Sequence, residues 1–384
     1  MSLENIKSVA VIGAGDMGHG IAEVALLGGY PVTLYDINTE AVEKGAGRIM
    51  ASVEKLAEKG KVPKEAVEQI RTKALTTTTD IGEAAGKADL IIEAAPEVLD
   101  LKKKIFAQLD EAAPAHALLA SNTSTMSITE IGAATKRPGQ VFGMHFFNPA
   151  VLMKLVEVIR SDDSADDTVE TGYAFAQKLG KVPVLVRRDT PGFIANRVNA
   201  APAVLFGAIV ESGEIEPEAL DAFMMNIGMP MGPCELTDFV GIDIAVNVAQ
   251  YFADQLHDDY APAPHLKAMV EKGHLGKKSG QGYYDWSNGR PEIDRSKATK
   301  VFNPLFPIFT QINEATKIVE QGVCSVADVD LAMINSTGNP MGPMSIGRQI
   351  SRWDLTDQLE RLARKYNNSV FEPTQAVRDG AHKH

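Results

Sequence analysis

A histidine and a glutamate twelve residues apart are the leading candidates for acid–base chemistry in this chain of 384 residues. His145 lies in the segment GMHFFNP, and Glu157 lies in the segment MKLVEVI. An imidazole can take up a proton near neutral pH, and a neighbouring carboxylate can fix its tautomer. The spacing alone does not establish that the two side chains meet, so their contact is a prediction.

A glycine-rich segment near the N-terminus is the second candidate site. Gly13, Gly15 and Gly18 form the pattern GxGxxG between an apolar run and a helical pattern. The first glycine permits a tight turn, the second lets the backbone approach a pyrophosphate, and the third allows close helix packing. The pattern predicts a dinucleotide site, with Met17 among the residues that contact the cofactor.

The acidic residue Asp36 closes the next apolar run and refines this prediction. A carboxylate at this place accepts hydrogen bonds from the adenosine ribose hydroxyls and repels the 2′-phosphate of NADP. Ile37 and Asn38 follow it, so no arginine compensates for that repulsion. We therefore expect NAD rather than NADP.

Alternating apolar and helical segments must position these residues. Strands are expected at 7–12, 31–36, 88–95 and 117–120, and helices are expected at 17–27 and 39–59. Alternation of this kind predicts a parallel, doubly wound sheet of the Rossmann type. After Thr190 helical periodicity prevails.

An internal repeat divides the helical region into two copies. Gly228 begins GMPMGP, and Gly338 begins GNPMGP; two shorter matches share a similar offset of 109 to 110 residues. The expected fold is thus an α/β Rossmann-type domain followed by two all-α domains of the same design, at 1–188, 189–290 and 296–384. At an offset of 109, Leu305 and Phe306 stand opposite Asn196 and Arg197, so the second copy lacks that polar pair.

Composition narrows the function classes. The formal net charge of -12 argues against nucleic acid as a partner. No apolar run approaches the length of a membrane helix, and the first residues carry no signal pattern, so a cytoplasmic location is expected. Cys234 and Cys324 show no zinc-ligand spacing, which predicts two buried thiols and no structural metal.

Five segments in order resemble the short-chain L-3-hydroxyacyl-CoA dehydrogenase family, and 3-hydroxybutyryl-CoA dehydrogenases in particular. They are GAGDMGHGIA, SNTS, HFFNPAVLMKLVEVI, DTPGFIANR and KKSGQGYYDW, and they span residues 13–286. The resemblance implies reversible oxidation of an (S)-3-hydroxyacyl-CoA, a CoA thioester, to the 3-ketoacyl-CoA with NAD.

The resemblance also implies roles for individual residues. His145 is the general base, Glu157 orients it, and Ser124 and Asn196 bind the reacting oxygen and the histidine region. The cofactor is also contacted by Glu97, Lys102, Asn148 and Lys278. The substrate is bound by Ser124 and Asn196, and its CoA moiety is contacted by Ser52 and Lys59. From the residues alone, Ser124 could equally cap a helix, and Lys59 could belong to a solvated helix face.

The resemblance leaves two matters open. A dehydrogenase acting on a free sugar acid of the L-gulonate type, or a non-catalytic, crystallin-like NAD-binding protein, would share much of this residue set. The second helical copy would act as a built-in partner for the first, giving a monomer with an internal pseudo-dimer, while a homodimer through other surfaces stays open.

Overall fold

The computed structural model describes residues 2–383 and divides into two compact units. Unit 1 extends to Ile194 and includes the separate stretch Gly322–Gly342, and unit 2 consists of Ala195–Gln321 and Pro343–His384. The chain thus leaves unit 1, builds most of unit 2, returns to unit 1 for one helix, and ends in unit 2.

Unit 1 is built on an eight-stranded sheet in the order β3-β2-β1-β4-β5-β6-β7-β8. The strands are β1 (Val9–Ile12), β2 (Val32–Tyr35), β3 (Leu75–Thr78), β4 (Leu90–Glu93), β5 (Leu118–Ser121), β6 (Val141–Phe146), β7 (Leu155–Ile159) and β8 (Val182–Val186). All residues of β1, β4, β5, β6 and β7 are buried. Such continuous burial is expected of strands covered on both faces.

The sheet is parallel from β3 to β6, as the sequence predicts, but its last two strands depart from that prediction. β7 pairs with β6 antiparallel, and β8 pairs with β7 parallel. Only residues 147–154 connect β6 to β7, and they include no helix that could carry a crossover. A short connection therefore turns the chain back and sets β7 directly beside β6.

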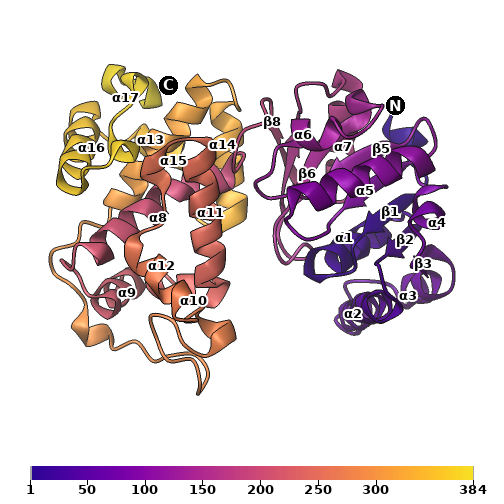
Figure 1. Cartoon of the computed structure of the whole chain (residues 1–384), viewed down its shortest axis with the longest axis horizontal. Coiled ribbons are helices and arrows are strands. Elements are labelled where there is room, and N and C mark those ends of the chain that lie inside the picture. Colours follow the sequence, from indigo (N-terminus) through magenta and orange to yellow (C-terminus); the bar gives the residue numbers. More distant parts are fainter. Residues whose placement is uncertain (1, 384) are drawn as a thin grey trace. The chain divides into compact units, whose positions relative to one another are not determined.

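Helices cover this sheet, and the core lies between the layers (Figure 1). They are α1 (Asp16–Leu27), α2 (Thr39–Glu58), α3 (Lys64–Gln69), α4 (Ile81–Ala85), α5 (Leu99–Ala112), α6 (Ile128–Gly132), α7 (Asp166–Lys178) and α14 (Val326–Thr337). Ile21 of α1 and Phe175 of α7 are fully buried against the strands in one apolar cluster. α14, from the returning stretch, packs on β7 and β8.

Unit 2 is helical. Its helices are α8 (Ala195–Glu211), α9 (Pro217–Asn226), α10 (Pro233–Val240), α11 (Ile242–Gln255), α12 (Pro264–Glu271), α13 (Phe306–Glu320), α15 (Pro343–Gly347), α16 (Arg352–Tyr366) and α17 (Gln375–Asp379). Its short 3-10 turns include η4 (Asp258–Tyr260) and η7 (Ser369–Phe371). α8 packs along α13, and a cluster including Leu205, Phe252 and Phe371 fills the core.

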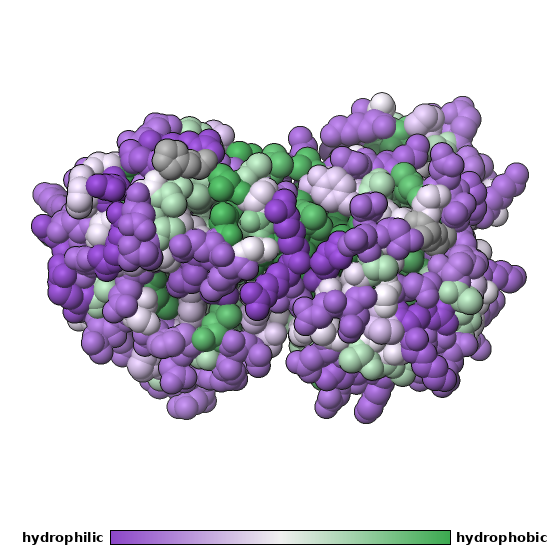
Figure 2. Space-filling view, turned by 90° about the horizontal axis from the view of Figure 1, so that it is seen from above, coloured by the Kyte–Doolittle hydropathy of each residue, from purple (hydrophilic) through white to green (hydrophobic). Residues whose placement is uncertain are grey.

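The face seen in Figure 2 is mainly hydrophilic, with hydrophobic residues exposed on part of it. Over residues 2–383 no helix combines the length and apolar character needed to cross a bilayer. Cys234 and Cys324 are free and buried, as predicted. Within the same residues, no group of three or more histidine, cysteine or acidic side chains is arranged to hold a metal ion.

Candidate active site

The predicted contact between His145 and Glu157 is present in the structure. The two residues are direct cross-strand partners of the antiparallel pair β6 and β7. The Nδ1 atom of His145 lies 2.7 Å from Oε2 of Glu157, and the side chains are 5% and 0% exposed. Directly opposed residues on one sheet face have adjacent side chains, so the reversal of β7 creates this contact.

The surroundings of the imidazole fix it further. The ring centroid lies 4.4 Å from that of Phe147 and 5.9 Å from that of Phe193. The second carboxylate oxygen of Glu157 accepts a hydrogen bond of 3.0 Å from the Ile194 backbone N–H. With Nδ1 donating to the carboxylate, the lone pair of a neutral ring resides on Nε2, which is the atom able to accept a proton.

The glycine loop has the shape that its pattern predicts. Gly13 has φ of 108°, and a Cβ there would lie 2.6 Å from the Ala94 carbonyl oxygen. A Cβ on Gly18 would lie 1.7 Å from the Gly13 carbonyl oxygen, whereas one on Gly15 would meet nothing within 4 Å. The first and third glycines are therefore required by packing, and the second leaves open space at the start of α1.

That open space suits an anionic cofactor. α1 begins directly after Gly15, so its free N–H groups and the positive end of its dipole lie beside the loop. The Asp36 carboxylate accepts hydrogen bonds of 2.8 Å from the N–H groups of Ala14 and Ile37, one on each oxygen. Each oxygen can accept further bonds, so the residues present fit the pyrophosphate and ribose of NAD.

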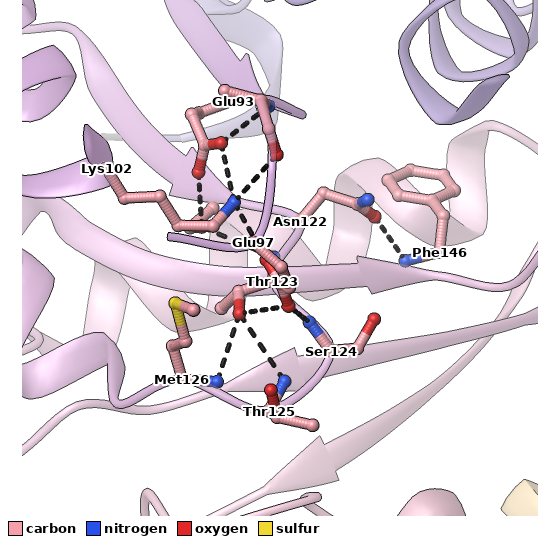
Figure 3. Close-up of polar contacts among 11 residues, drawn as sticks. Glu93, Glu97, Lys102, Asn122, Thr123, Ser124, Thr125, Met126 and Phe146 are labelled. Carbon is pink, nitrogen blue, oxygen red and sulfur yellow. Dashed lines mark hydrogen bonds and ion pairs between the residues drawn. The ribbon is translucent and has the colours of Figure 1, made fainter. Parts of the chain in front are cut away.

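A buried ion-pair network supports the neighbouring loops (Figure 3). Lys102 is 1% exposed, and its Nζ lies 2.7 Å from Glu93 Oε1 and 3.1 Å from Glu97 Oε2. Glu93 also accepts bonds from Ser121 Oγ at 2.6 Å and from the Ala95 N–H at 2.7 Å. The lysine predicted to line the cofactor site is thus enclosed by protein groups and holds Glu97 in place.

Glu97 in turn positions Ser124. One of its oxygens accepts bonds from the Ser124 N–H at 2.6 Å and from Thr123 Oγ1 at 2.7 Å. The Ser124 hydroxyl points away from that carboxylate (Figure 3). Asn122 Oδ1 accepts a bond of 2.8 Å from the Phe146 N–H, which ties this loop to the residue after His145.

These groups gather at one edge of the sheet. Strands β1, β4, β5 and β6 are parallel neighbours, so their carboxyl ends share that edge. The glycine loop follows β1, Glu97 follows β4, Ser124 follows β5, and His145 lies near the end of β6. Ligands of open α/β sheets bind at this edge, beside the point where the strand order reverses.

The remaining predicted residues lie in the loop after β6, in or next to α2, and in unit 2. Asn148 is exposed in the loop after β6, and Lys59 is exposed at the end of α2. The Ser52 hydroxyl, predicted to meet CoA, donates a hydrogen bond of 2.6 Å to the buried carboxylate of Glu23. In unit 2, Asn196 lies in the first turn of α8, and Lys278 forms an ion pair with Asp243.

Three residues that support the site were not anticipated. Glu93 is a fully buried carboxylate within the apolar run ADLIIEAA, and an acidic residue inside such a run is a signal that sequence reasoning could have used. Asn122 lies within the SNTS segment without an assigned role. Phe193 adopts a φ of 54° while fully buried, and nothing in the residue type announces this conformation.

A dinucleotide loop and a carboxylate-steered histidine on one sheet edge are the parts of an NAD-dependent dehydrogenase. The comparisons narrow this class. Residues 8–190 match the NAD binding domain of 3-hydroxyacyl-CoA dehydrogenase, and residues 192–286 and 307–382 match its C-terminal domain. The chain therefore belongs to the 3-hydroxyacyl-CoA dehydrogenase family and is an NAD-dependent oxidoreductase.

Individual relatives agree with this assignment. A probable 3-hydroxybutyryl-CoA dehydrogenase of Bacillus subtilis is 43% identical over 73% of this chain and 98% of its own length. A 3-hydroxyadipyl-CoA dehydrogenase of Escherichia coli is 34% identical over 98% of both chains. The crystal structure of an E. coli 3-hydroxybutyryl-CoA dehydrogenase has a TM-score of 0.88 at 33% identity, with 98% of each chain covered.

Proposed function

We propose that the protein oxidises short (S)-3-hydroxyacyl-CoA thioesters reversibly to 3-ketoacyl-CoA, with His145 as general base. The observation that carries this proposal is the 2.7 Å contact between His145 and Glu157 at the sheet edge that also carries the dinucleotide loop. NAD, when bound, accepts the hydride from C3 of the substrate. A histidine base of this kind contributes about 10² to 10⁴ in rate.

Each protein group has a separate task in this scheme. Nε2 of His145 takes the proton of the substrate hydroxyl, and Glu157 holds the ring and stabilises the resulting imidazolium. Ser124 and Asn196 hydrogen-bond the reacting oxygen. The CoA moiety is contacted by Ser52 and Lys59. Lys102 acts on the cofactor site through Glu97. The cofactor itself is bound by Gly13, Gly15, Met17, Gly18, Asp36, Glu97, Asn148 and Lys278.

Two acyl groups are candidates for the substrate. The B. subtilis relative favours 3-hydroxybutyryl-CoA by its higher identity, whereas the E. coli 3-hydroxyadipyl-CoA dehydrogenase matches this chain over its whole length. Steady-state oxidation of both thioesters and of a longer 3-hydroxyacyl-CoA tests the choice. A higher kcat/KM for 3-hydroxybutyryl-CoA is expected, and a preference for the adipyl or the longer thioester would contradict the short-chain assignment.

We also propose that residues 296–384 duplicate residues 189–290 and act as their partner within one chain, after the sheet domain at 1–188. Helices at an offset of about 109 residues support this: α8 with α13, α9 with α14, α10 with α15, α11 with α16 and α12 with α17. In both copies a glycine approaches an aspartate, Gly232 with Asp221 and Gly342 with Asp330.

This duplication predicts a monomer in solution. The close packing of α8 along α13 supports it, since the first copy then has its partner within the chain. Light scattering should give a mass near 41.3 kDa. A dimer that dissociates when exposed residues of the first copy are substituted would contradict the proposal.

Two free buried thiols support a reducing, cytoplasmic location.

A further inference from the structure

We propose that unit 2 binds a phosphate group in a polar cavity between α8, α13, η4 and η7. The cavity has a volume of about 240 Å³. Its lining residues come from these four elements and their ends: Arg197, Leu256, His257, Tyr260, Lys317, Gln321, Ser369 and Val370. None of them belongs to the dehydrogenase site proposed above, and the inference does not rest on the proposed substrate.

A buried arginine with unused donor capacity is the first observation. Arg197 is 3% exposed, yet its Nη1 atom is buried and has no hydrogen-bond partner among residues 2–383. An unpartnered donor on a charged buried group is costly, since both its water and its protein contacts are lost. An oxyanion in the adjoining cavity would satisfy this donor.

Two cations beside the cavity share one buried carboxylate, that of Glu314. Arg197 Nε hydrogen-bonds Oε1 of Glu314, and Lys317 Nζ lies 3.1 Å from Oε2 of the same carboxylate. Tyr260 donates its hydroxyl to Oε2 at 2.8 Å. One buried carboxylate thus faces two cations; although burial opposes its ionisation, Lys317 and Arg197 hold the pKa of Glu314 below its ordinary value.

A second carboxylate near the cavity, that of Asp259, is hydrogen-bonded to Ser369. Asp259 Oδ2 accepts bonds from the Ser369 N–H at 2.7 Å and from its hydroxyl at 2.5 Å. The exposed ring of His257 lies 3.6 Å from that carboxylate, and its Nδ1 accepts a hydrogen bond of 3.1 Å from the Asp259 N–H. Guanidinium and ammonium donors on one cavity are groups that proteins use to bind phosphate.

The repeat suggests that this set is not required for helix packing. At the offset of 109, the places of Arg197, Glu314 and Lys317 are taken by Phe306, Leu205 and Ala208. Positions related by the repeat on α8 and α13 thus carry apolar residues in one case and the charged cluster in the other. A group needed only for packing would not have to be charged.

The test is titration of the full chain with inorganic phosphate while NAD saturates the glycine loop. Saturable binding is expected, with protection from hydrogen exchange confined to residues 256–260, 317–321 and 369–370. Lys317→Met and Gln321→Glu should weaken binding about ten-fold or more, through loss of a charge-assisted bond and through repulsion. Lys297→Met is the matched control, since Lys297 pairs with Glu218 outside the cavity, and it should bind as the wild type does.

The outcomes separate cleanly. Absence of saturable binding by the wild-type chain, or equal binding by Lys317→Met, Gln321→Glu and Lys297→Met, would overturn the proposal. Glycerol 3-phosphate serves as a second probe. If inorganic phosphate binds more tightly, the ligand of the site is the free ion. If glycerol 3-phosphate binds more tightly, the ligand is a phosphate monoester. Either result supports the site. Turnover is not the readout, so failure of the dehydrogenase assignment would leave this result interpretable.

Discussion

At the scale of single residues, the proposed chemistry depends on which nitrogen of His145 carries a proton. Glu157 uses one oxygen for the imidazole and the other for the Ile194 N–H, so the carboxylate cannot rotate freely. Phe147 and Phe193 contact the ring and limit its tilt. The result is an imidazole whose free nitrogen is fixed in direction before substrate arrives, which lowers the cost of proton transfer.

Replacing Glu157 by glutamine should preserve the shape of the site and remove its steering. The amide can still accept the Ile194 N–H bond, but it can donate to Nδ1 and so place the imidazole proton on Nε2. We expect kcat to fall by about 10² to 10⁴ while the Kd for NAD stays unchanged. Glu130→Gln, at an exposed carboxylate paired with Lys103, is the control; a Glu157→Gln enzyme as active as this control would contradict the assigned role.

At the scale of elements, the turn from β1 into α1 separates packing from cofactor binding. Gly15→Ala should leave the melting temperature nearly unchanged, because its φ of −68° suits any residue and its Cβ meets nothing within 4 Å. NAD should nevertheless bind at least about ten-fold more weakly, since the methyl group would occupy space that the pyrophosphate needs.

Gly18→Ala is the matched variant in the same turn. Its Cβ would overlap the Gly13 carbonyl oxygen, so the turn itself must shift. We expect a loss of stability of roughly 1–3 kcal/mol, measured by chemical unfolding, together with weaker NAD binding. Equal stability of the two variants would show that the loop is not packed as described here.

The sequence predicts the elements that carry the site better than the contacts that support it. The strands β1, β2 and β4 lie within the segments expected from their apolar runs, and β5 extends one residue beyond its segment, because burial on both faces requires such runs. The pairing of His145 with Glu157 depends on strand direction, which local patterns do not encode. The burial of Lys102 likewise depends on Glu93 and Glu97, which become its neighbours only after folding.

At the scale of the whole molecule, a buried carboxylate makes stability depend on pH. Asp221 is fully buried, and burial raises its pKa to about 6, although it accepts bonds from Cys234 N, Glu235 N and the Tyr284 hydroxyl. The unfolded chain ionises at a lower pH than the folded one, so stability from this group falls as pH rises from about 4 to 6. The loss is roughly 3 kcal/mol.

Chemical unfolding at pH 5 and pH 7.5 checks this expectation. Asp221→Asn removes the titrating group. The variant should be less stable than the wild type, because a hydrogen-bond acceptor is lost. Its stability should nevertheless decline less between these two pH values. For each protein, the quantity compared is the change in the free energy of unfolding between the two pH values, not the free energy itself. An identical decline in the two proteins would exclude Asp221 as its source.

Proton transfer at position 145 next to a nicotinamide is the central step of the proposed reaction. The most direct test is His145→Gln, assayed for oxidation of NADH by acetoacetyl-CoA and, separately, for NAD binding. We predict an unchanged Kd for NAD and a fall in kcat of about 10² or more. Turnover close to that of the wild-type enzyme would contradict the assignment of His145 as the base.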